Sequence, residues 1–256
     1  MTTSVKTFSA KLRREFLFWN SKAYWRSLKG IHNGRRGFVL GNGPSLRIED
    51  LDRLQGEISI ASNKIFLAFE KTAWRPDYHT ITDELVMPKV LDDLPKHFKA
   101  THAEENCLVF PRGMQVRVWR RLRRGKDKEF FGLPFSLQPD LGFYGGGTVT
   151  YQNLQLAAYL GLNPIYIVGC DHYYADEEGS VTNRPIETKE TNNHFIEGYR
   201  KPGEIVSPAP IDFMNEAYAT AAEFSRRSEI QILNATRGGH LEAFPRVDLD
   251  EVLGSE

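Results

Sequence analysis

A glycine-rich turn follows the first apolar run of the chain. Residues 38–40 (Phe-Val-Leu) are bounded by glycines, which is typical of a short buried strand. The turn reads Gly-Asn-Gly-Pro-Ser; it lacks the third glycine of a dinucleotide fingerprint and the Gly-Lys-Ser/Thr of a P-loop. We expect Gly41, Asn42, Gly43 and Ser45 to form a turn that approaches a ligand closely and places a side-chain amide beside it.

Polar side chains also follow other predicted strands. Asn63 and Asp83 follow the second and third strands, and Asp171, Tyr173 and Tyr174 follow the fifth. In an open parallel sheet, ligands bind outside the carboxyl ends of the strands. Asn and Asp are common turn formers, so each residue alone is explained as a turn. A row of them at one edge instead predicts a binding site for a polar ligand.

A second glycine run, at residues 145–147, leads directly into a helical pattern that starts near Thr148. Backbone N–H groups at the N-terminus of a helix bind anions. We expect Gly146, Gly147 and Thr148 to contact a phosphate or the edge of a base. The alternative is that the glycines form a flexible hinge.

His194 is the candidate general base. It lies in a polar segment, where packing in the core is not expected, and an imidazole is suited to accept a proton near neutral pH. Its alternative role is that of a solvent-exposed loop residue. His172, at a strand end, and His240, after a Gly-Gly pair, are the competing candidates.

The chain alternates apolar strand-like segments with helical patterns. Strands are expected at 38–40, 58–62, 78–82, 107–110, 165–168 and 230–233, and helices at 148–160 and 212–228. This alternation predicts an α/β fold, with a parallel sheet covered by helices on both faces.

Three segments lie outside this regular pattern. Residues 1–36 are expected to be a helical extension, so that the domain spans 37–256. A basic insertion at 112–130 is either a helix that faces phosphates or a solvated face, since runs of charge are commonly solvated. Residues 175–210 are polar and too long for an ordinary loop, and we interpret them as a mobile lid.

The N-terminal extension is basic and aromatic. Residues 1–36 hold nine Lys and Arg against one acid, and Leu12, Phe16 and Trp19 have helical spacing. Such a helix either packs its aromatic face on the domain or lies on an anionic membrane surface.

Composition narrows the function classes. Thirty-three basic residues balance thirty-three acidic ones, which disfavours a protein that coats nucleic acid through bulk charge. No uncharged apolar run approaches the roughly 18 residues of a spanning helix. Two cysteines cannot form a disulfide scaffold or a four-thiolate zinc site, which indicates a reduced, cytoplasmic protein.

Taken together, these motifs resemble the MptE-like family, named for an archaeal 6-hydroxymethylpterin diphosphokinase. The resemblance rests on Gly-Asn-Gly-Pro-Ser-Leu after the first strand, Asn63, Gly-Gly-Thr before a helix, and Tyr-Ile-Val-Gly-Cys-Asp-His-Tyr. The layout is also similar to that of the short bacterial sialyltransferases that use CMP-sialic acid. It runs from about Gly37 to Asp248 and implies a Rossmann-like nucleotide-binding domain.

The sialyltransferase resemblance implies roles for single residues. Asn42 and Asn63 would contact the nucleotide on its phosphate side, and Gly147 with Thr148 would border the base or ribose. Tyr173 would hydrogen-bond the departing phosphate, and His194, in the Asn-Asn-His-Phe segment, would be the general base. The family's second tyrosine is missing at its usual spacing, where Tyr174 or Tyr199 are the available substitutes.

Two reactions and one non-catalytic role therefore stay open. The favoured one is an inverting, metal-independent glycosyltransferase without a cofactor, which moves an acidic sugar from a CMP-type donor to a surface glycan or lipid-linked acceptor. The alternative is a diphosphokinase that uses ATP and Mg²⁺, for which Asp83, Asp171 and Asp176 are the candidate carboxylates. The third is a non-catalytic nucleotide-binding subunit. A homo-oligomer is compatible with each of these three functions. The glycosyltransferase would act in the cytoplasm or peripherally on the inner membrane face.

Overall fold

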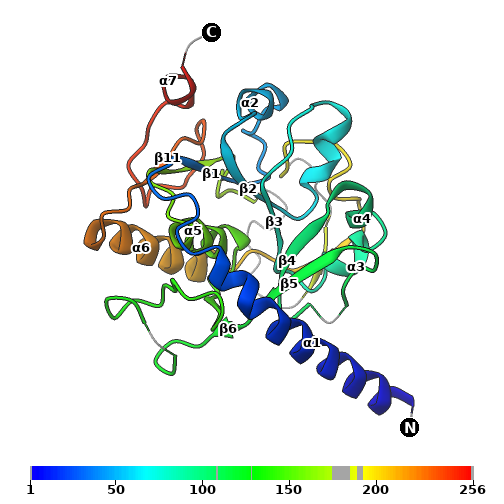
Figure 1. The fold of residues 1–256 in the computed structure, drawn as a ribbon. Helices are drawn as coiled ribbons and strands as arrows, with labels where there is room; N and C mark the ends of the chain where they lie inside the picture. The colour runs from blue at the N-terminus through cyan, green and yellow to red at the C-terminus, as the bar shows by residue number, and fades with distance from the viewer. Residues whose placement is uncertain (1, 108, 128, 175–184, 189–192, 255–256) are drawn as a thin grey trace.

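The computed structural model describes residues 2–107, 109–127, 129–174, 185–188 and 193–254, with side chains from residue 12 onward (Figure 1). Within this part of the chain, seven strands form one parallel sheet in the order β11-β8-β1-β2-β3-β4-β5. The strands are β1 (Gly37–Leu40), β2 (Ile58–Ser62), β3 (Tyr78–Ile81), β4 (Ala100–Glu104), β5 (Gln115–Trp119), β8 (Ile165–Val168) and β11 (Ile232–Asn234). The predicted Rossmann-like α/β class is confirmed.

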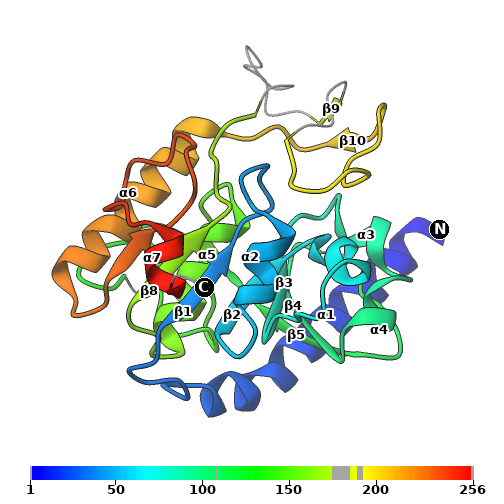
Figure 2. The same ribbon diagram turned by 90° about the horizontal axis from the view of Figure 1, so that it is seen from above.

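Helices cover both faces of this sheet (Figures 1 and 2). They are α1 (Thr2–Ser27), α2 (Ile48–Arg53), a 3₁₀ helix (Ile65–Glu70), α3 (Met87–Val90), α4 (Leu94–His97), α5 (Val149–Tyr159), α6 (Ile211–Arg227) and α7 (Leu249–Leu253). Successive residues of β1 point to opposite faces, so Val39 joins the core under α5 and α6 while Phe38 and Leu40 join the core under α2. Two hydrophobic cores thus hold the sheet between helices.

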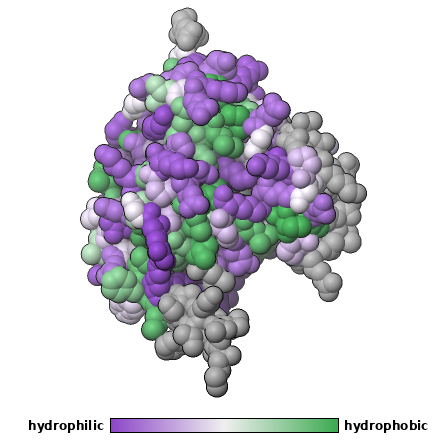
Figure 3. All heavy atoms as spheres, turned by 90° about the vertical axis from the view of Figure 1, so that its right-hand side faces the viewer, coloured by the Kyte–Doolittle hydropathy of each residue, from purple (hydrophilic) through white to green (hydrophobic). Residues whose placement is uncertain are grey.

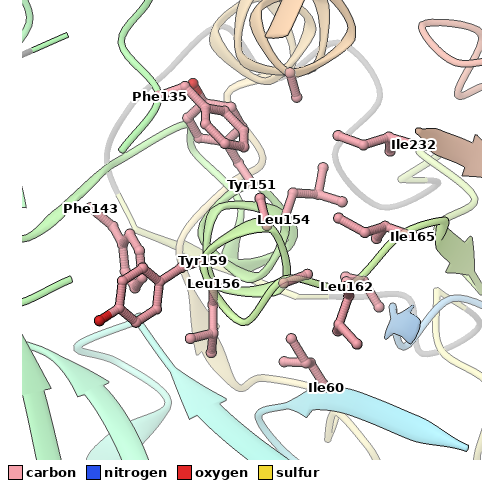
Figure 4. Packing of buried hydrophobic residues seen from close by; sticks show 14 of the residues in the cluster. Ile60, Phe135, Phe143, Tyr151, Leu154, Leu156, Tyr159, Leu162, Ile165 and Ile232 are labelled. Carbon is pink, nitrogen blue, oxygen red and sulfur yellow. The ribbon is translucent and has the colours of Figure 1, made fainter. Parts of the chain in front are cut away.

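Helix α5 is buried on all sides and occupies the centre of the larger core. Figure 4 shows Tyr151, Leu154 and Tyr159 on this helix among apolar side chains of the sheet and of the segment before it. The polar Gln155 is also buried, and its amide is satisfied by Tyr144 N, Tyr144 O and Ser136 N at 2.9–3.0 Å. This burial fixes the N-terminus of α5 relative to the strands.

The order of the strands reverses at β1. The chain proceeds from β1 through β2, β3 and β4 to β5 on one side, and then adds β8 and β11 on the other side of β1. In open parallel sheets, this reversal leaves a crevice outside the carboxyl ends of the two central strands. Here those strands are β1 and β8.

Two strand predictions need correction. Of the segment 107–110, the described residues 107, 109 and 110 are not in a strand. Cys107 and Phe110 are buried between β4 and β5 in the sequence. Sequence reasoning missed β4 because Thr101 and His102 look polar. Both side chains are buried and hydrogen-bonded: Thr101 Oγ1 lies 2.8 Å from His79 Nδ1, and His102 Nδ1 lies 2.9 Å from His79 O. The last strand is β11, two residues later than predicted at its start.

The edge strand β5 is covered by α1. Ser21 Oγ accepts a hydrogen bond from Val118 N (2.9 Å), and Trp25 Nε1 donates one to Val118 O (3.0 Å). An uncovered edge strand would leave these backbone groups open to pairing with another chain. The N-terminal extension is therefore packed against the sheet rather than appended to it.

The basic insertion is not a helix. It contains β5 and then β6 (Arg121–Leu122), which pairs with β7 (Phe143–Tyr144). The predicted lid lies partly outside the described residues, at 175–184 and 189–192. Its described part includes an antiparallel pair, β9 (Ile186–Glu187) and β10 (Ile205–Val206), which lies beside the sheet in Figure 2.

No helix in the described part of the chain is long and apolar enough to cross a membrane. On the face shown in Figure 3, hydrophobic residues form a band between hydrophilic ones.

The α1–β5 contact yields a stability prediction. Ser21→Ala removes the acceptor of the Val118 N–H, and an unpaired buried donor costs about 1–3 kcal/mol. We expect urea unfolding to show that loss of free energy. Ser27→Ala is the matched control, because Ser27 is exposed and bonds only within its own helix, to Tyr24 O; it should change stability by less than about 0.5 kcal/mol. Equal effects of the two substitutions would contradict the role of Ser21.

Candidate active site

A cavity of about 990 Å³ lies at the carboxyl ends of the strands, where the strand order reverses. It brings together residues that are far apart in the sequence. Of the predicted site residues, those that line it are Gly41, Asn42, Gly43, Asn63, Asp83, Gly146, Gly147, Thr148, Asp171, Tyr173, Tyr174 and His194. Ser45 is not among the lining residues; it lies behind Asp171.

The turn after β1 packs directly on the turn after β8. Gly41 N donates to Val168 O (2.8 Å) and Gly43 N to Gly169 O (2.9 Å). A Cβ atom at Gly41 would lie 2.2 Å from Gly169 O, and one at Gly43 would lie 2.0 Å from Asp171 Oδ2. Protein atoms, the Gly169 carbonyl and the Asp171 carboxylate, therefore already require glycine at these two positions, whether or not a ligand binds there.

Asp171, in the turn after β8, is hydrogen-bonded to the turn after β1. Its Oδ2 accepts hydrogen bonds from Ser45 Oγ (2.9 Å) and Ser45 N (3.3 Å). Burial raises the pKa of Asp171, and the two bonds from Ser45 oppose that rise. The carboxylate therefore positions the turn, and Ser45 acts through it.

Two asparagines present acceptor oxygens at the cavity. Asn42 Nδ2 donates to Ser62 O and Ser62 Oγ, both at 3.3 Å. Asn63 adopts the left-handed conformation, with φ 56°. The Oδ1 atoms of Asn42 and Asn63 are buried and have no hydrogen-bond partner among the described residues. Buried polar atoms are normally paired, so these oxygens are suited to accept hydrogen bonds from amino or hydroxyl groups of a ligand.

The N-terminus of α5 also opens on the cavity. Thr148 caps the helix, with its Oγ1 accepting from Thr150 N at 3.2 Å. Gly147 has φ 70°, and a Cβ atom at Gly146 would lie 2.5 Å from Ala217 Cβ. Small residues thus let the helix start against α6, with its backbone N–H groups toward the cavity, where an anion is stabilised.

His194 is half-buried against Tyr199. The two rings stack at 3.9 Å between centroids with an interplanar angle of 11°. Burial, together with the nearby charges of Arg200 and Lys64, lowers the pKa of His194 to about 3. Its Nδ1 is buried and has no hydrogen-bond partner in the described part of the chain. The imidazole is therefore neutral at physiological pH.

The segment that carries His194 is tied to the sheet. Phe195 N donates to Asn42 O (3.1 Å), and Lys64 Nζ donates to Tyr199 O (2.6 Å). Glu204 holds Lys64 at 3.3 Å and Lys89 at 2.7 Å. Burial alone would raise the pKa of Glu204, but the bond from Lys89 and the two lysine charges lower it to about 2.

The family model "6-hydroxymethylpterin diphosphokinase MptE-like" matches residues 17–177, which is more than half of the chain. The chain belongs to the MptE-like family. The match begins inside α1, not at residue 37, which agrees with the packing of α1 on the sheet. The family's named activity, a diphosphokinase, makes this MptE-like chain a member of a family of transferases.

No curated protein matches the MptE-like chain in sequence. Among solved structures, UDP-N-acetylglucosamine 4-epimerase from Bacillus cereus is similar at 11% identity and a TM-score of 0.23. That alignment covers 78% of this chain and 52% of the epimerase chain, so the chain spans about half the length of that protein.

The other candidate histidines differ from His194. His172 lines the cavity, but its Nε2 is hydrogen-bonded to Asn215 Oδ1 at 2.7 Å. His240 is not among the lining residues, and its ring lies 5.5 Å from that of Tyr173. Of the three, His194 combines a place at the cavity with a stacked aromatic support.

The three tyrosines at the cavity differ in how exposed their side chains are. Tyr173 is 51% exposed at the cavity, where its hydroxyl is accessible to a ligand. Tyr199 lines the cavity but is buried, and burial raises its pKa. Tyr174 lines the cavity and has its hydroxyl 4.0 Å from Met214 Sδ. Tyr199 thus supports His194, while Tyr173 faces solvent.

Sequence reasoning missed a cation that lines the cavity. Arg121 is 54% exposed, and its Nε lies 2.6 Å from Oε1 of the fully buried Glu104. Gln152 Nε2 donates to the other oxygen of Glu104. Burial raises the pKa of Glu104, while Arg121 and Gln152 lower it. Arg121 is therefore held in place beside Gly145 by its pairing with the buried Glu104.

Three other arginines of the basic insertion are engaged elsewhere. The Arg117 guanidinium lies 4.5 Å from the Tyr24 ring centroid, Arg120 pairs with Glu15, and Arg124 pairs with Glu216 at 3.0 Å. The run of charge itself was visible in the sequence. Nothing in it separates Arg121 from its neighbours, because the buried Glu104 comes from another strand.

The described residues contain no cluster of three His, Cys, Asp or Glu that would hold a metal ion. Asp83 and Asp171 both line the cavity, but Asp83 Oδ1 accepts from Leu85 N (2.7 Å) and Asp171 is bonded to Ser45. Asp176 lies outside the described residues. Mg²⁺ needs only one or two carboxylates when phosphates supply other oxygens, so Asp83 and Asp171 fit an ion that arrives with a nucleotide.

Arg121 generates a binding prediction. Arg121→Gln removes a fixed charge from the cavity wall. We expect the Kd for an anionic nucleotide such as CMP or ATP to rise roughly 10- to 100-fold, since hydrogen bonds to charged groups contribute about 1.5–3 kcal/mol. Isothermal titration calorimetry measures the change. Arg124→Gln, from the same insertion but paired at the surface with Glu216, should leave Kd within about twofold. An equal loss of nucleotide affinity in both variants would indicate a general effect of net charge and would contradict a specific role of Arg121.

Proposed function

We propose that this MptE-like protein is an inverting glycosyltransferase that takes an acidic sugar from a CMP-type donor. The observation that carries the proposal is the position of His194: a neutral imidazole on a stacked aromatic support, in the same cavity as Asn42, Asn63 and the N-terminus of α5. A nucleophilic displacement needs a base beside the donor site, and these residues supply both. Its acceptor would be a hydroxyl of a surface glycan or lipid-linked glycan.

The reaction would be a single displacement. The acceptor oxygen attacks the anomeric carbon while the bond from that carbon to the phosphate oxygen breaks, which inverts the configuration. His194 takes the acceptor proton, and the nucleoside monophosphate leaves with the electron pair of the broken bond. Tyr173 is the candidate hydroxyl that hydrogen-bonds the leaving phosphate, and the α5 N-terminus would lie on its other side.

Charge in the cavity matches an anionic donor. Arg121 offers a fixed guanidinium for a phosphate or for the carboxylate of an acidic sugar. The bound phosphate would also act on His194, because a nearby negative charge favours the protonated imidazole and raises its pKa from the low value of the empty site. The base would thus strengthen when donor binds.

The alternative is the activity for which the MptE-like family is named. A hydroxyl of a pterin-like molecule would attack the β-phosphorus of ATP, and AMP would leave. Asp83 or Asp171, both at the cavity, would hold a Mg²⁺ ion, which would neutralise charge on the phosphates. A non-catalytic nucleotide-binding subunit is the third candidate, which leaves His194 without a role.

Nucleotide preference separates these candidates. We expect CMP or CDP to raise Tm in EDTA as well as in Mg²⁺, because a ligand that binds only the folded form stabilises it. The panel includes UDP, GDP and ATP under both conditions. A shift with ATP that requires Mg²⁺ would replace the glycosyltransferase with the diphosphokinase. No shift with any nucleotide would contradict a nucleotide site altogether.

Replacement of His194 tests the base. His194→Ala should lower kcat by roughly 10²–10⁴ while nucleotide Kd changes little, because general-base catalysis contributes that factor. His97→Ala, at an exposed position outside the cavity lining, is the control and should retain full activity. An unchanged kcat in His194→Ala would refute the assignment.

The pH profile gives an independent readout of His194. In the free enzyme the pKa is lowered to about 3, so kcat/KM should not fall as pH drops through 6.5. Bound phosphate raises that pKa, so kcat should fall at a higher pH than kcat/KM does. A fall of kcat/KM near pH 6.5 would contradict the lowered pKa of His194 in the free enzyme.

A further inference from the structure

We propose that α1 docks this protein on an anionic membrane surface through an exposed apolar stripe formed by Leu12, Phe16 and Trp19. The proposal concerns a surface away from the cavity and does not depend on the reaction catalysed there.

Helix α1 has two opposite apolar faces. Phe18, Trp25 and Leu28 are buried against the domain. Leu12, Phe16 and Trp19, spaced by four and three residues, lie on the other side and are 56%, 65% and 62% exposed. The sequence suggested one aromatic face, and the structure divides it into one that packs and one that does not.

The exposed stripe has a cationic border. Lys22 Nζ lies 4.0 Å from the Trp19 ring centroid, and Arg13 is exposed on the same helix. Lys29 is exposed just beyond the end of the helix at Ser27. The one acid of this segment, Glu15, is paired with Arg120. Stripe and border together therefore present apolar side chains flanked by net positive charge.

This combination matches an anionic lipid surface. Aromatic and aliphatic side chains enter the boundary between headgroups and acyl chains, while Lys and Arg remain at the negatively charged headgroups. A hydrophobic protein partner would account for the stripe but not for its cationic border. The charge complementarity therefore selects the membrane as the occupant.

The position of α1 leaves the stripe accessible. Figures 1 and 2 show the N-terminal half of the helix extending beyond the body of the domain. The opposite face of the helix is held on β5 by Ser21 and Trp25. A flat surface can thus reach the outer side while the inner side stays packed.

Trp19 provides a direct probe. The other tryptophans, Trp25, Trp74 and Trp119, are at most 1% exposed, so a blue shift of emission on adding vesicles would report Trp19 entering an apolar phase. With the full chain, we expect this shift and co-sedimentation with vesicles of phosphatidylcholine and phosphatidylglycerol (3:1), but not with phosphatidylcholine alone. Binding should weaken as salt is raised.

Substitutions identify the surface. L12Q/F16Q/W19Q should lower the vesicle partition coefficient roughly tenfold or more, since it removes the apolar part of the interaction. The matched control, I31Q/F131Q/L141Q, removes three exposed apolar side chains elsewhere and should bind like the parent. Circular dichroism and Tm should be unchanged in both, because the side chains are exposed.

Two results would overturn the proposal. One is equal sedimentation of the parent and of L12Q/F16Q/W19Q. The other is a dimer in the absence of vesicles, seen by light scattering and abolished in that variant, which would assign the stripe to contact between two copies. Neither readout involves a nucleotide, so the proposed reaction can fail while the docking surface stands.

Discussion

The close contact between the turns after β1 and β8 is the constraint on which the site depends. Gly41 and Gly43 have no room for a side chain, because Gly169 O and the Asp171 carboxylate occupy the space. The contact occurs where the strand order reverses, so it also fixes the floor of the cavity. Asn42, held between the two glycines, is thereby directed at Ser62 and the second strand.

The other walls are attached to this floor by separate interactions. Helix α5 is immobilised by burial on every side, which places its N-terminus opposite the turns. The segment with His194 is held by Phe195 and, through Lys64 and Glu204, by charge pairing. A partly buried ion-pair network of this kind mainly orients the segment and adds little to the free energy of unfolding, since the cost of desolvating the charges offsets much of their attraction. The network therefore keeps the segment with His194 in one position at the cavity.

The basic segments illustrate how burial sorts charges that look alike in the sequence. Arg120 and Arg124 are neutralised at the surface, whereas Arg121 is fixed by a buried carboxylate and lines the cavity. In α1, likewise, Phe18 is buried and Phe16 is exposed, although both are aromatic residues of one helix. Which member of such a group contacts the domain depends on the rotation of the helix relative to β5.

The sequence by itself determined the α/β class, most strands of the sheet, and the row of polar residues at one edge. It could do so because buried parallel strands are continuous apolar runs and their ends carry turn residues. It also singled out His194, through residue type and a resemblance. The strand β4 was missed because its polar side chains are satisfied only by partners on neighbouring strands.

Only the tertiary structure decided which side chains from distant segments are in contact. It placed Ser45 behind Asp171, stacked His194 on Tyr199, and joined Arg121 to Glu104. Each of these pairs connects segments distant in the chain, and their proximity follows from strand order and helix packing. Local sequence sets which residues can form such contacts, but the burial and distance that make them act are properties of the folded chain.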